Sequence, residues 1–530
     1  MGAVDEVRTG QEHEEHDDER ATDADVIVVG AGPAGLMLAA ELRLAGARPL
    51  VLERHPQLGH TPNANGLGGQ IIELLRYRGL LERFEAAAVD AHPTPIYPFG
   101  GVHLDLTRLA DPPLKGMQLQ HPSVDRLLEE RATELGAEIR FGHRVVGVQQ
   151  DDAAVTADVE GPDGPYRVTA RYLVGCDGAY SRIRDMAGIA FPGTTYPEVN
   201  RLAEVTLPAS VTVLENGDLD VPGVGRVAAG YTRTDGGVFA FGSLTPEVLM
   251  IQTIEEEASA EYGDEAPMTL AELGESIRRV RGIDLPLGEP RRLSRYQHHA
   301  RQADRYRNGR ILLAGDAAHV LPATGVARSV GMLDAVNLAW KLAADVHGWA
   351  PAGLLDSYHD ERHFAGARAL LQTQAQVALR RGHDEAADAL RAVFVELLVD
   401  EQPARRLAAL IAGADVRYPL PGADHHALAG TFAPDLTLRT DDGTTSVAEL
   451  LHLARPVLLL LADRPDLVET ARGWEQRVDV LVAETDDRPA DALLIRPDAH
   501  VAWAAAIDEP ADTAGPALRE ALAGWFGKEA

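Results

Sequence analysis

The chain has 530 residues, of which 45% are hydrophobic and 25% charged, enough for two or three globular domains with buried cores. Its formal net charge of −31 argues against nucleic acid or an anionic membrane as the principal partner. The sequence contains no apolar stretch of about 18 residues, the length of a membrane-spanning helix. A single cysteine, Cys176, excludes an internal disulfide framework and fits a reducing cytoplasm, where we expect the protein to act.

Residues 1–22 are expected to form a disordered acidic tail. They carry eight acidic side chains against two arginines, so like-charge repulsion opposes a compact structure. The segment also lacks the apolar run of a secretory signal, which agrees with a cytoplasmic location.

The first segment with a clear chemical meaning lies between an apolar run, Val26–Val29, and an apolar-periodic segment, Leu36–Leu42. These patterns predict a strand and a helix. The turn between them reads Gly30-Ala31-Gly32-Pro33-Ala34-Gly35, and its glycines let backbone amides approach a pyrophosphate at the positive end of the helix. Glu53 ends the next apparent strand, at the spacing typical of an acid that binds a ribose hydroxyl. The segment therefore predicts an adenine-dinucleotide site.

Hydrophobic periodicity divides the rest of the chain. Strands alternate with helices to about residue 193, including a helix near 124–135, which predicts a doubly wound α/β domain. Residues 194–295 are β-rich, with one helix near 270–280, and predict a second domain inserted into the first. Helices resume from 334 to about 412, and a turn-rich stretch follows. We assign residues 23–193 and 296–412 to the dinucleotide-binding domain, 194–295 to the inserted domain and 413–530 to a C-terminal domain.

Two later segments complete a three-part pattern. Cys176-Asp177-Gly178 lies in the run Tyr172–Arg184, and Gly315-Asp316-Ala317-Ala318-His319 follows the run Arg310–Ala314. These segments resemble the FAD-dependent aromatic hydroxylases of the para-hydroxybenzoate hydroxylase group, and residues 354–362 are similar to a further stretch of that family. The resemblance extends from about Ala24 to the C-terminus. It points to bacterial hydroxylases of aromatic polyketides, such as the angucycline and anthracycline enzymes.

The resemblance implies a monooxygenase of antibiotic biosynthesis in which NADPH reduces FAD, oxygen adds to form a C4a-hydroperoxyflavin, and the distal oxygen passes to an aromatic polyketide. It places Asp316 on a ribityl or ribose hydroxyl of FAD, and the Asp177-Gly178 turn near the pyrophosphate and the nicotinamide donor. The residues expected to bind the cofactor are Gly30, Gly32, Ala34, Gly35, Glu53, Arg54, Asp177, Gly178, Gly315, Asp316 and Gly325.

The substrate pocket is expected between the β-rich domain and the FAD-binding domain, because ligand sites favour domain interfaces. The residues expected to face it are Phe239, Phe241, Tyr296, His298 and Pro322, although each also fits core packing. The sequence assigns no base with certainty; the catalytic candidates are Arg328, His319 and Tyr231. His319 also fits a structural role, because flavin chemistry needs no histidine nucleophile.

The loop after the Gly-Asp segment departs from the family pattern. The family usually has Pro-x-Gly-Gly-Gln-Gly-x-Asn, whereas residues 322–329 keep only one of these glycines, Gly325, and place Arg328 near the expected flavin ring. Residues 63–70 depart as well, where the family tends to carry Arg-x-Leu-Gly. Arg328 in a working hydroxylase would turn to solvent or to the FAD phosphates. In a second interpretation, the flavin ring is held differently or not at all, and the protein catalyses a dehydration, a rearrangement or a cofactor-free step. In a third interpretation, the protein is not an enzyme and has a binding role.

The segment from about residue 427 to 526 alternates apolar strands with helices and resembles the thioredoxin-like domain appended to this family. It contains no cysteine, so thiol redox chemistry is excluded there. We expect a structural role or a contact in a homodimer.

Overall fold

The computed structural model describes residues 22–58, 66–93, 96–119, 123–245, 248–256, 267–322, 327–382, 384–420 and 426–529. Three predictions therefore lie outside the described residues: the acidic tail apart from its last residue, the first part of the 63–70 departure, and Gly325 with its neighbours at 323–326.

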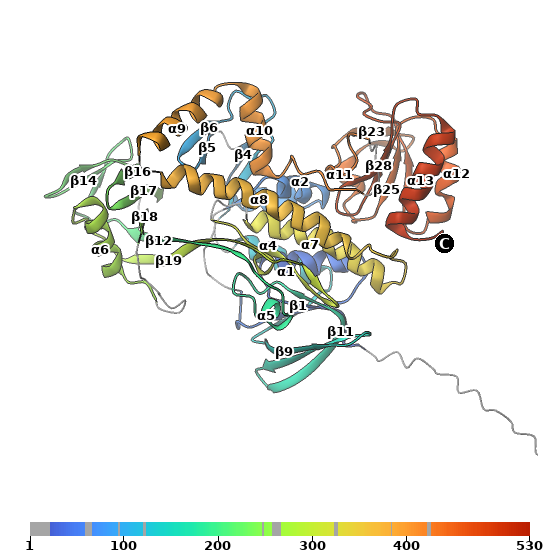
Figure 1. The fold of residues 1–530 in the computed structure, drawn as a ribbon, viewed down its shortest axis with the longest axis horizontal. Helices are drawn as coiled ribbons and strands as arrows, with labels where there is room; N and C mark the ends of the chain where they lie inside the picture. Colours follow the sequence, from blue (N-terminus) through green and yellow to red (C-terminus); the bar gives the residue numbers. More distant parts are fainter. Residues whose placement is uncertain are drawn as a thin grey trace, which may run out of the picture.

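A largely parallel sheet surrounds the first strand, so the predicted α/β class is confirmed (Figure 1). Strand β1 (Ala24–Val29) pairs in parallel with β2 (Pro49–Glu53) on one side and with β11 (Gly164–Gly175) on the other. The sheet continues through β8 (Glu138–Phe141) at one edge and through β21 (Ile311–Leu313) and β20 (Arg307–Asn308) at the other, and β9 (Arg144–Gln150) and β10 (Val155–Gly161) extend it beside β11. The apolar runs are fully buried because α1 (Pro33–Leu44) packs between the sheet, α4 (Ser123–Glu134) and α7 (Ala327–Val346).

The β-rich region forms a six-stranded antiparallel sheet in the order β16-β17-β18-β12-β19-β22. Helix α6 (Leu270–Arg281) packs on one face of this sheet, as the pattern at 270–280 predicted. The strands of this sheet are β12 (Gly193–Thr206), β16 (Gly230–Thr234), β17 (Gly237–Thr245), β18 (Val248–Glu256), β19 (Pro290–Gln302) and β22 (His319–Val320). Because β22 follows the Gly-Asp segment directly, this sheet is attached to the predicted cofactor site. A small sheet of β13 (Thr212–Val213), β14 (Leu219–Val221) and β15 (Gly225–Val227) extends the region.

The predicted helical region is confirmed and begins at Ala327, earlier than expected. It consists of α7, α8 (Ser357–Arg381), α9 (Glu385–Leu397) and α10 (Glu401–Ala412). Several shorter elements complete this part of the chain. They are β3 (Leu67–Gly68), α2 (Gln70–Tyr77), α3 (Leu81–Ala87), β4 (Ala88–Pro93), β5 (Ile96–Phe99), β6 (Val102–Asp105), β7 (Lys115–Leu119) and α5 (Arg182–Met186).

The C-terminal region has its own mixed sheet in the order β26-β25-β27-β28 (Figure 1, red). Its elements are β23 (Thr437–Thr440), β24 (Gly443–Ser446), α11 (Val447–Leu450), β25 (Val457–Leu460), α12 (Pro465–Ala471), β26 (Asp479–Val482), β27 (Ala492–Ile495), β28 (Val501–Ala505) and α13 (Ala511–Phe526). Trp340 of α7 belongs to the same apolar cluster as α12 and α13, so this region is packed onto the rest of the chain. Among the described helices, none combines the length and apolar character that crossing a membrane requires.

Candidate active site

The three predicted turns meet because they leave neighbouring parallel strands at the same end. β1 pairs with β11, and β11 pairs in parallel with β21, so their carboxyl ends lie side by side. The turns open onto a cavity of about 500 Å³, within the roughly 300–1,000 Å³ typical of cofactor and small-molecule sites. The cavity continues past the start of α7 to the face of β19. Ligands of open α/β sheets bind at this edge.

The glycine turn allows close backbone packing and exposes helix amides. Gly30 has φ +107°, and a Cβ there would lie 2.5 Å from the Cys176 carbonyl oxygen; a Cβ on Gly35 would overlap the carbonyl of Gly30. Gly32 is the N-cap of α1 and Pro33 occupies the first turn, and no side chain of the described residues caps this end. Gly32 and Ala34 line the cavity. The uncapped amides are therefore available to an anion such as a pyrophosphate.

Glu53 lies beside this turn. Its Oε2 accepts a hydrogen bond from the Ala31 amide at 2.9 Å, and its Oε1 contacts Nδ1 of His55 at 2.6 Å. Oε1 also accepts from the His55 amide at 2.8 Å, so the remaining capacity for a ribose hydroxyl lies on Oε2. Arg54 is exposed at the end of β2 and lies outside the cavity lining.

The Asp177 carboxylate organises its own turn. It accepts hydrogen bonds from Oγ of Ser181 at 2.5 Å and from the amides of Arg182 and Ile183, at 2.8 and 3.2 Å, at the start of α5. Gly178 and the buried Cys176 line the cavity in its place. Burial raises the pKa of the Cys176 thiol, so it remains a protonated, small apolar group.

Arg184 joins two of the turns, a role that the sequence analysis missed. Its Nη1 donates to the carbonyl oxygens of Ala179 and Ala317, both at 3.1 Å, and its guanidinium lies 3.8 Å from the ring centre of Phe191. The position of Arg184 directly after the Asp-Gly segment was the feature of the sequence that could have indicated this role. This side chain holds the Asp-Gly turn against the Gly-Asp turn.

Asp316 projects into the cavity from a turn that Gly315 makes possible with φ +64°. Its exposed surface faces the cavity, while the carboxyl lies deep within the protein. Burial raises the pKa of Asp316, and His319 and Arg328 oppose the rise. The carboxyl is placed to accept hydrogen bonds from ligand hydroxyls.

Arg328, in the first turn of α7, lines the same cavity. The electrostatic field of Arg328 also reaches Asp125 of α4, whose pKa burial raises and Arg328 lowers. Oδ1 of Asp125 is buried and has no hydrogen-bond partner among the described residues. Asp125 was not predicted from the sequence, where an acid in the first turn of the predicted helix was its only signal. Arg328 is thus accompanied by two carboxyls, those of Asp125 and Asp316.

One face of β19 lines the far side of the cavity. Because side chains alternate along a strand, Arg292, Ser294, Tyr296 and His298 share this face. Burial raises the pKa of Tyr296. Burial, together with nearby Arg380 and His299, lowers the pKa of His298 to about 3, so its imidazole is neutral at physiological pH. Tyr296 and His298 therefore line the cavity, and alternation along the strand could have identified Arg292 and Ser294 beside them.

The two predicted phenylalanines lie on the opposite face of the sheet, which corrects the expectation that they face the pocket. Strand register aligns Phe239 with Thr253 and Arg201, and Phe241 with Ile251 and Ala203; both rings pack in the core beneath α6. The phenylalanines face away from the cavity because successive residues of a strand point to opposite faces of the sheet, so a shift of one residue in register reverses the face.

The remaining candidates lie around the cavity. Tyr231 is in the same cross-strand row as Leu202 and Ser294, which line the cavity, but it is 68% exposed at the edge strand β16. Pro322 is buried next to Leu321, a lining residue. His319 is fully buried outside the lining, with Nε2 2.7 Å from Oδ2 of Asp334.

The residues present fit FAD. The cradle at Gly30 and Gly35 accepts no side chain, the α1 amides are uncapped, and Asp316 and the unpartnered Oδ1 of Asp125 offer acceptors to hydroxyl groups. Groups of three or more histidine, cysteine or acidic side chains able to hold a metal ion are not found in the described part of the chain.

Comparisons with known proteins agree with this geometry. The model of the FAD binding domain family matches residues 23–373, and that of the aromatic-ring hydroxylase C-terminal region matches residues 426–529. The 12-dehydrotetracycline 5-monooxygenase/anhydrotetracycline 6-monooxygenase of Streptomyces rimosus subsp. rimosus is 40% identical over 516 residues, 96% of this chain and 99% of that protein. The dialkyldecalin synthase of Streptomyces rugosporus is 37% identical over 508 residues, 95% of this chain and 99% of that protein.

Among solved structures, CabE, an aromatic hydroxylase from angucycline biosynthesis, superimposes with a TM-score of 0.84 at 38% identity, covering 96% of this chain and 100% of that one. These matches span nearly the whole chain and confirm the resemblance seen in the sequence. The chain belongs to the FAD-binding-domain family that includes the aromatic-ring hydroxylases.

Proposed function

We propose that this protein is an FAD- and NADPH-dependent monooxygenase that hydroxylates an aromatic polyketide in antibiotic biosynthesis. The observation that carries the proposal is one continuous cavity, lined at one end by the glycine turn and Asp316 and at the other by the polar face of β19. Such a cavity has room for a cofactor and, beside it, for an oxygen-bearing aromatic substrate. NADPH is inferred from the class of reaction.

Within this cavity each group has a distinct task. The α1 amides bind the pyrophosphate, Glu53 accepts from the ribose and Asp316 from the ribityl chain; bound FAD supplies the oxidation chemistry. Neutral His298 accepts a hydrogen bond from a phenol of the substrate and so orients the ring that carries it. The apolar side chains of Leu202 and Leu321 line the same cavity and exclude water from it.

Three finer features belong to the same proposal. The mixed four-stranded C-terminal sheet supports a thioredoxin-like domain, which serves a structural or homodimer-contact role because the only cysteine of the chain is Cys176. The predicted domain boundaries remain as assigned from the sequence. The single buried thiol supports a cytoplasmic location.

Purification and titration test this function. The protein is expected to bind FAD with a visible flavin spectrum and to oxidise NADPH faster when a suitable aromatic polyketide, such as an anhydrotetracycline, is added, with formation of a hydroxylated product. Colourless protein that FAD cannot reconstitute would remove the hydroxylase proposal. If the protein binds flavin but transfers oxygen to no member of a panel of aromatic polyketides, the proposed FAD binding would stand and the proposed hydroxylation would be contradicted.

Arg328 supports a second candidate, in which the flavin ring is displaced and the protein catalyses a dehydration, a rearrangement or another non-oxidative step. Its long cationic side chain enters the cavity where the family has a small-residue loop. A 37%-identical relative is named a dialkyldecalin synthase rather than a monooxygenase. If Arg328 excludes the ring by its bulk, Arg328→Gly should tighten FAD binding, whereas Arg328→Lys, which keeps length and charge, should not. Equal affinities in all three proteins would count against exclusion.

A further inference from the structure

A buried carboxylate, Asp334 of α7, lies directly behind the Gly-Asp turn and is fully buried. Its Oδ2 accepts a hydrogen bond from the Gly315 amide at 3.0 Å and lies 2.7 Å from Nε2 of His319. Its Oδ1 accepts from Nε of Arg362 on α8 at 2.7 Å. One side chain therefore connects the turn that carries Asp316 to helix α8.

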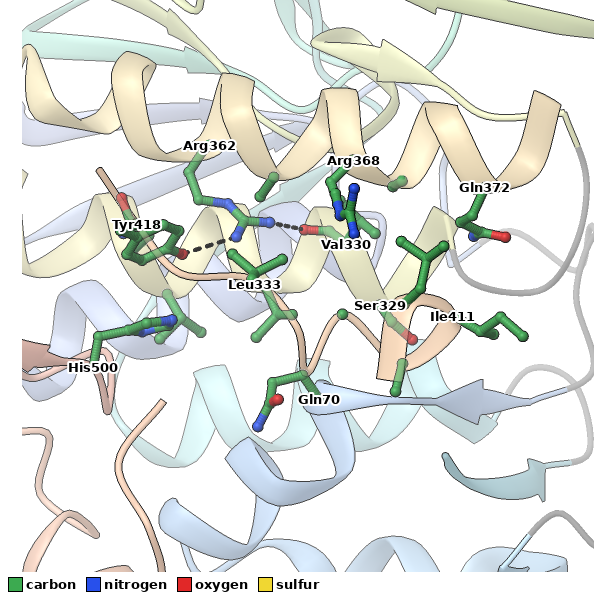
Figure 2. Close-up of a pocket in the computed structure, with 18 of the residues that line it drawn as sticks. Gln70, Ser329, Val330, Leu333, Arg362, Arg368, Gln372, Ile411, Tyr418 and His500 are labelled. Atoms are coloured by element: carbon green, nitrogen blue, oxygen red, sulfur yellow. Dashed lines mark hydrogen bonds between the residues drawn. The ribbon is translucent and has the colours of Figure 1, made fainter. Parts of the chain in front are cut away.

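Arg362 extends this connection to the C-terminal region. Its Nη1 donates to the Tyr418 hydroxyl at 2.9 Å and its Nη2 to the Val330 carbonyl at 3.1 Å (Figure 2). The Tyr418 ring stacks on His500, with centroids 4.2 Å apart, and Nδ1 of His500 bonds the Asp498 carbonyl at 2.9 Å. Tyr418 follows α10, and His500 directly precedes β28. The path thus runs from Gly315 to the C-terminal sheet through buried groups alone.

The start of α7 needs such support because it separates two cavities. Arg328 and Gly331 line the cofactor cavity, whereas Val330 and Leu333 line a second cavity of about 50 Å³ on the other side (Figure 2). This second space is too small for a cofactor-sized ligand and suits a few water molecules. Because packing is incomplete on both sides of this turn, the directional bonds of Asp334 and Arg362 fix its position.

We propose that Asp334 is a positioning residue that, through Arg362 and Tyr418, makes the placement of Gly315 and Asp316 depend on the C-terminal region and thereby sets the affinity for FAD. This inference rests on the proposed function, because it takes FAD as the ligand of Asp316. The effect is confined to the ribityl and flavin end, since the pyrophosphate turn at Gly30–Gly35 is not bonded to Asp334.

The test compares Asp334→Asn and Tyr418→Phe with Tyr77→Phe as a matched control. The Tyr77 hydroxyl is also buried and donates to Ala433 in the C-terminal region at 2.8 Å, but it is not bonded to Asp334 or Arg362. Flavin fluorescence gives the FAD dissociation constant, the visible spectrum reports the flavin environment, and ADP probes the adenine end alone. Asp334→Asn is expected to weaken FAD binding about tenfold or more, because a charged acceptor is lost, and Tyr418→Phe by about threefold. Asp334→Asn and Tyr418→Phe should leave the affinity for ADP unchanged. Tyr77→Phe should change neither the affinity for FAD nor that for ADP.

The outcomes separate the inference from the function. Wild-type protein that binds no FAD overturns both. Wild-type protein that binds FAD while Asp334→Asn and Tyr418→Phe bind it equally well, with the same spectrum, overturns the inference alone. Equal weakening by Tyr418→Phe and Tyr77→Phe also overturns it, because it indicates a general loss of domain packing. If Asp334→Asn does not fold, the comparison of FAD affinity between Tyr418→Phe and Tyr77→Phe tests the inference.

Discussion

Gly331 of α7 packs directly against Gly315, so closely that a methyl group on Gly331 would lie 2.8 Å from the Gly315 Cα. This contact brings the helix onto the turn and lets Asp334, three residues further along α7, reach the Gly315 amide. Neither glycine is interchangeable with alanine in this arrangement, because Gly315 also has φ +64°.

Gly331→Ala is therefore expected to push α7 away from the turn. We expect a loss of about 1–3 kcal/mol in the free energy of unfolding, the usual cost of overpacking, together with weaker FAD binding. Gly274→Ala is the control, because Gly274 is also helical but has open space around its Cβ position; it should be neutral or stabilise by about 0.5–1 kcal/mol. Denaturant unfolding and FAD titration measure both effects. Similar behaviour of the two variants would mean that the contact does not constrain the turn.

Arg184→Met should separate the Asp-Gly and Gly-Asp turns while keeping most of the buried volume. The variant leaves the carbonyls of Ala179 and Ala317 without their donor, at a cost of about 1–3 kcal/mol in unfolding free energy. FAD affinity should fall as well, because both turns line its cavity. Arg182→Met, an exposed position in the same short helix, is the control and should change neither quantity. Unaltered FAD affinity in Arg184→Met would show that the turns hold their places independently.

Local patterns in the sequence were sufficient to place the Gly30–Gly35 turn beside Glu53. The Gly30–Gly35 turn, its flanking strand and helix, and Glu53 lie within one supersecondary unit, so spacing alone could place them. Asp334 and Arg362 could not be found this way, because their roles arise from contacts between α7, α8 and Tyr418.

The strands of the β-rich region show a second reason why prediction from the sequence fails. Phe239 and Phe241 are residue types expected in an aromatic pocket. The face of the sheet on which each side chain lies depends on the register of its strand with the neighbouring strands, and residue type does not determine register. Tyr296 and His298 line the cavity, and their alternation with Arg292 and Ser294 is visible in the sequence once the strand is recognised.

Asp125 should make the ligand-free protein less stable as the pH rises. Burial raises its pKa above the ordinary value of 3.8, so the unfolded chain loses this proton first, and stability falls as the pH rises from about 3.8 through the raised value. Asp125→Asn removes this dependence and should be more stable than the wild type near pH 7.5, by about 1 kcal/mol, the scale of one buried unpaired acceptor. Thermal unfolding across pH measures it, with exposed Asp442→Asn as the control. A stability difference that is the same at low and neutral pH would contradict this account.

His298 should affect both turnover and acid stability. Because burial lowers its pKa to about 3, the folded protein keeps the imidazole neutral and able to accept a hydrogen bond throughout the physiological range. His298→Phe keeps an aromatic ring but removes the acceptor, and should lower substrate-stimulated turnover by about tenfold, the scale of one lost orienting hydrogen bond of about 1.4 kcal/mol. FAD affinity should remain unchanged, since His298 lies on the β19 side of the cavity.

The acid response has the opposite sign to that of Asp125. Between the ordinary pKa of 6.5 and the lowered value of about 3, the unfolded chain binds a proton that folded His298 does not, so the wild type loses stability as the pH falls through this range. The His298→Phe variant should lose less stability than the wild type over this pH range. His143→Phe, which changes a histidine outside the cavity lining, should retain the wild-type turnover. If His298→Phe lowers turnover but keeps the full acid response, another group is responsible for that response; if turnover is unchanged, His298 does not contact the substrate.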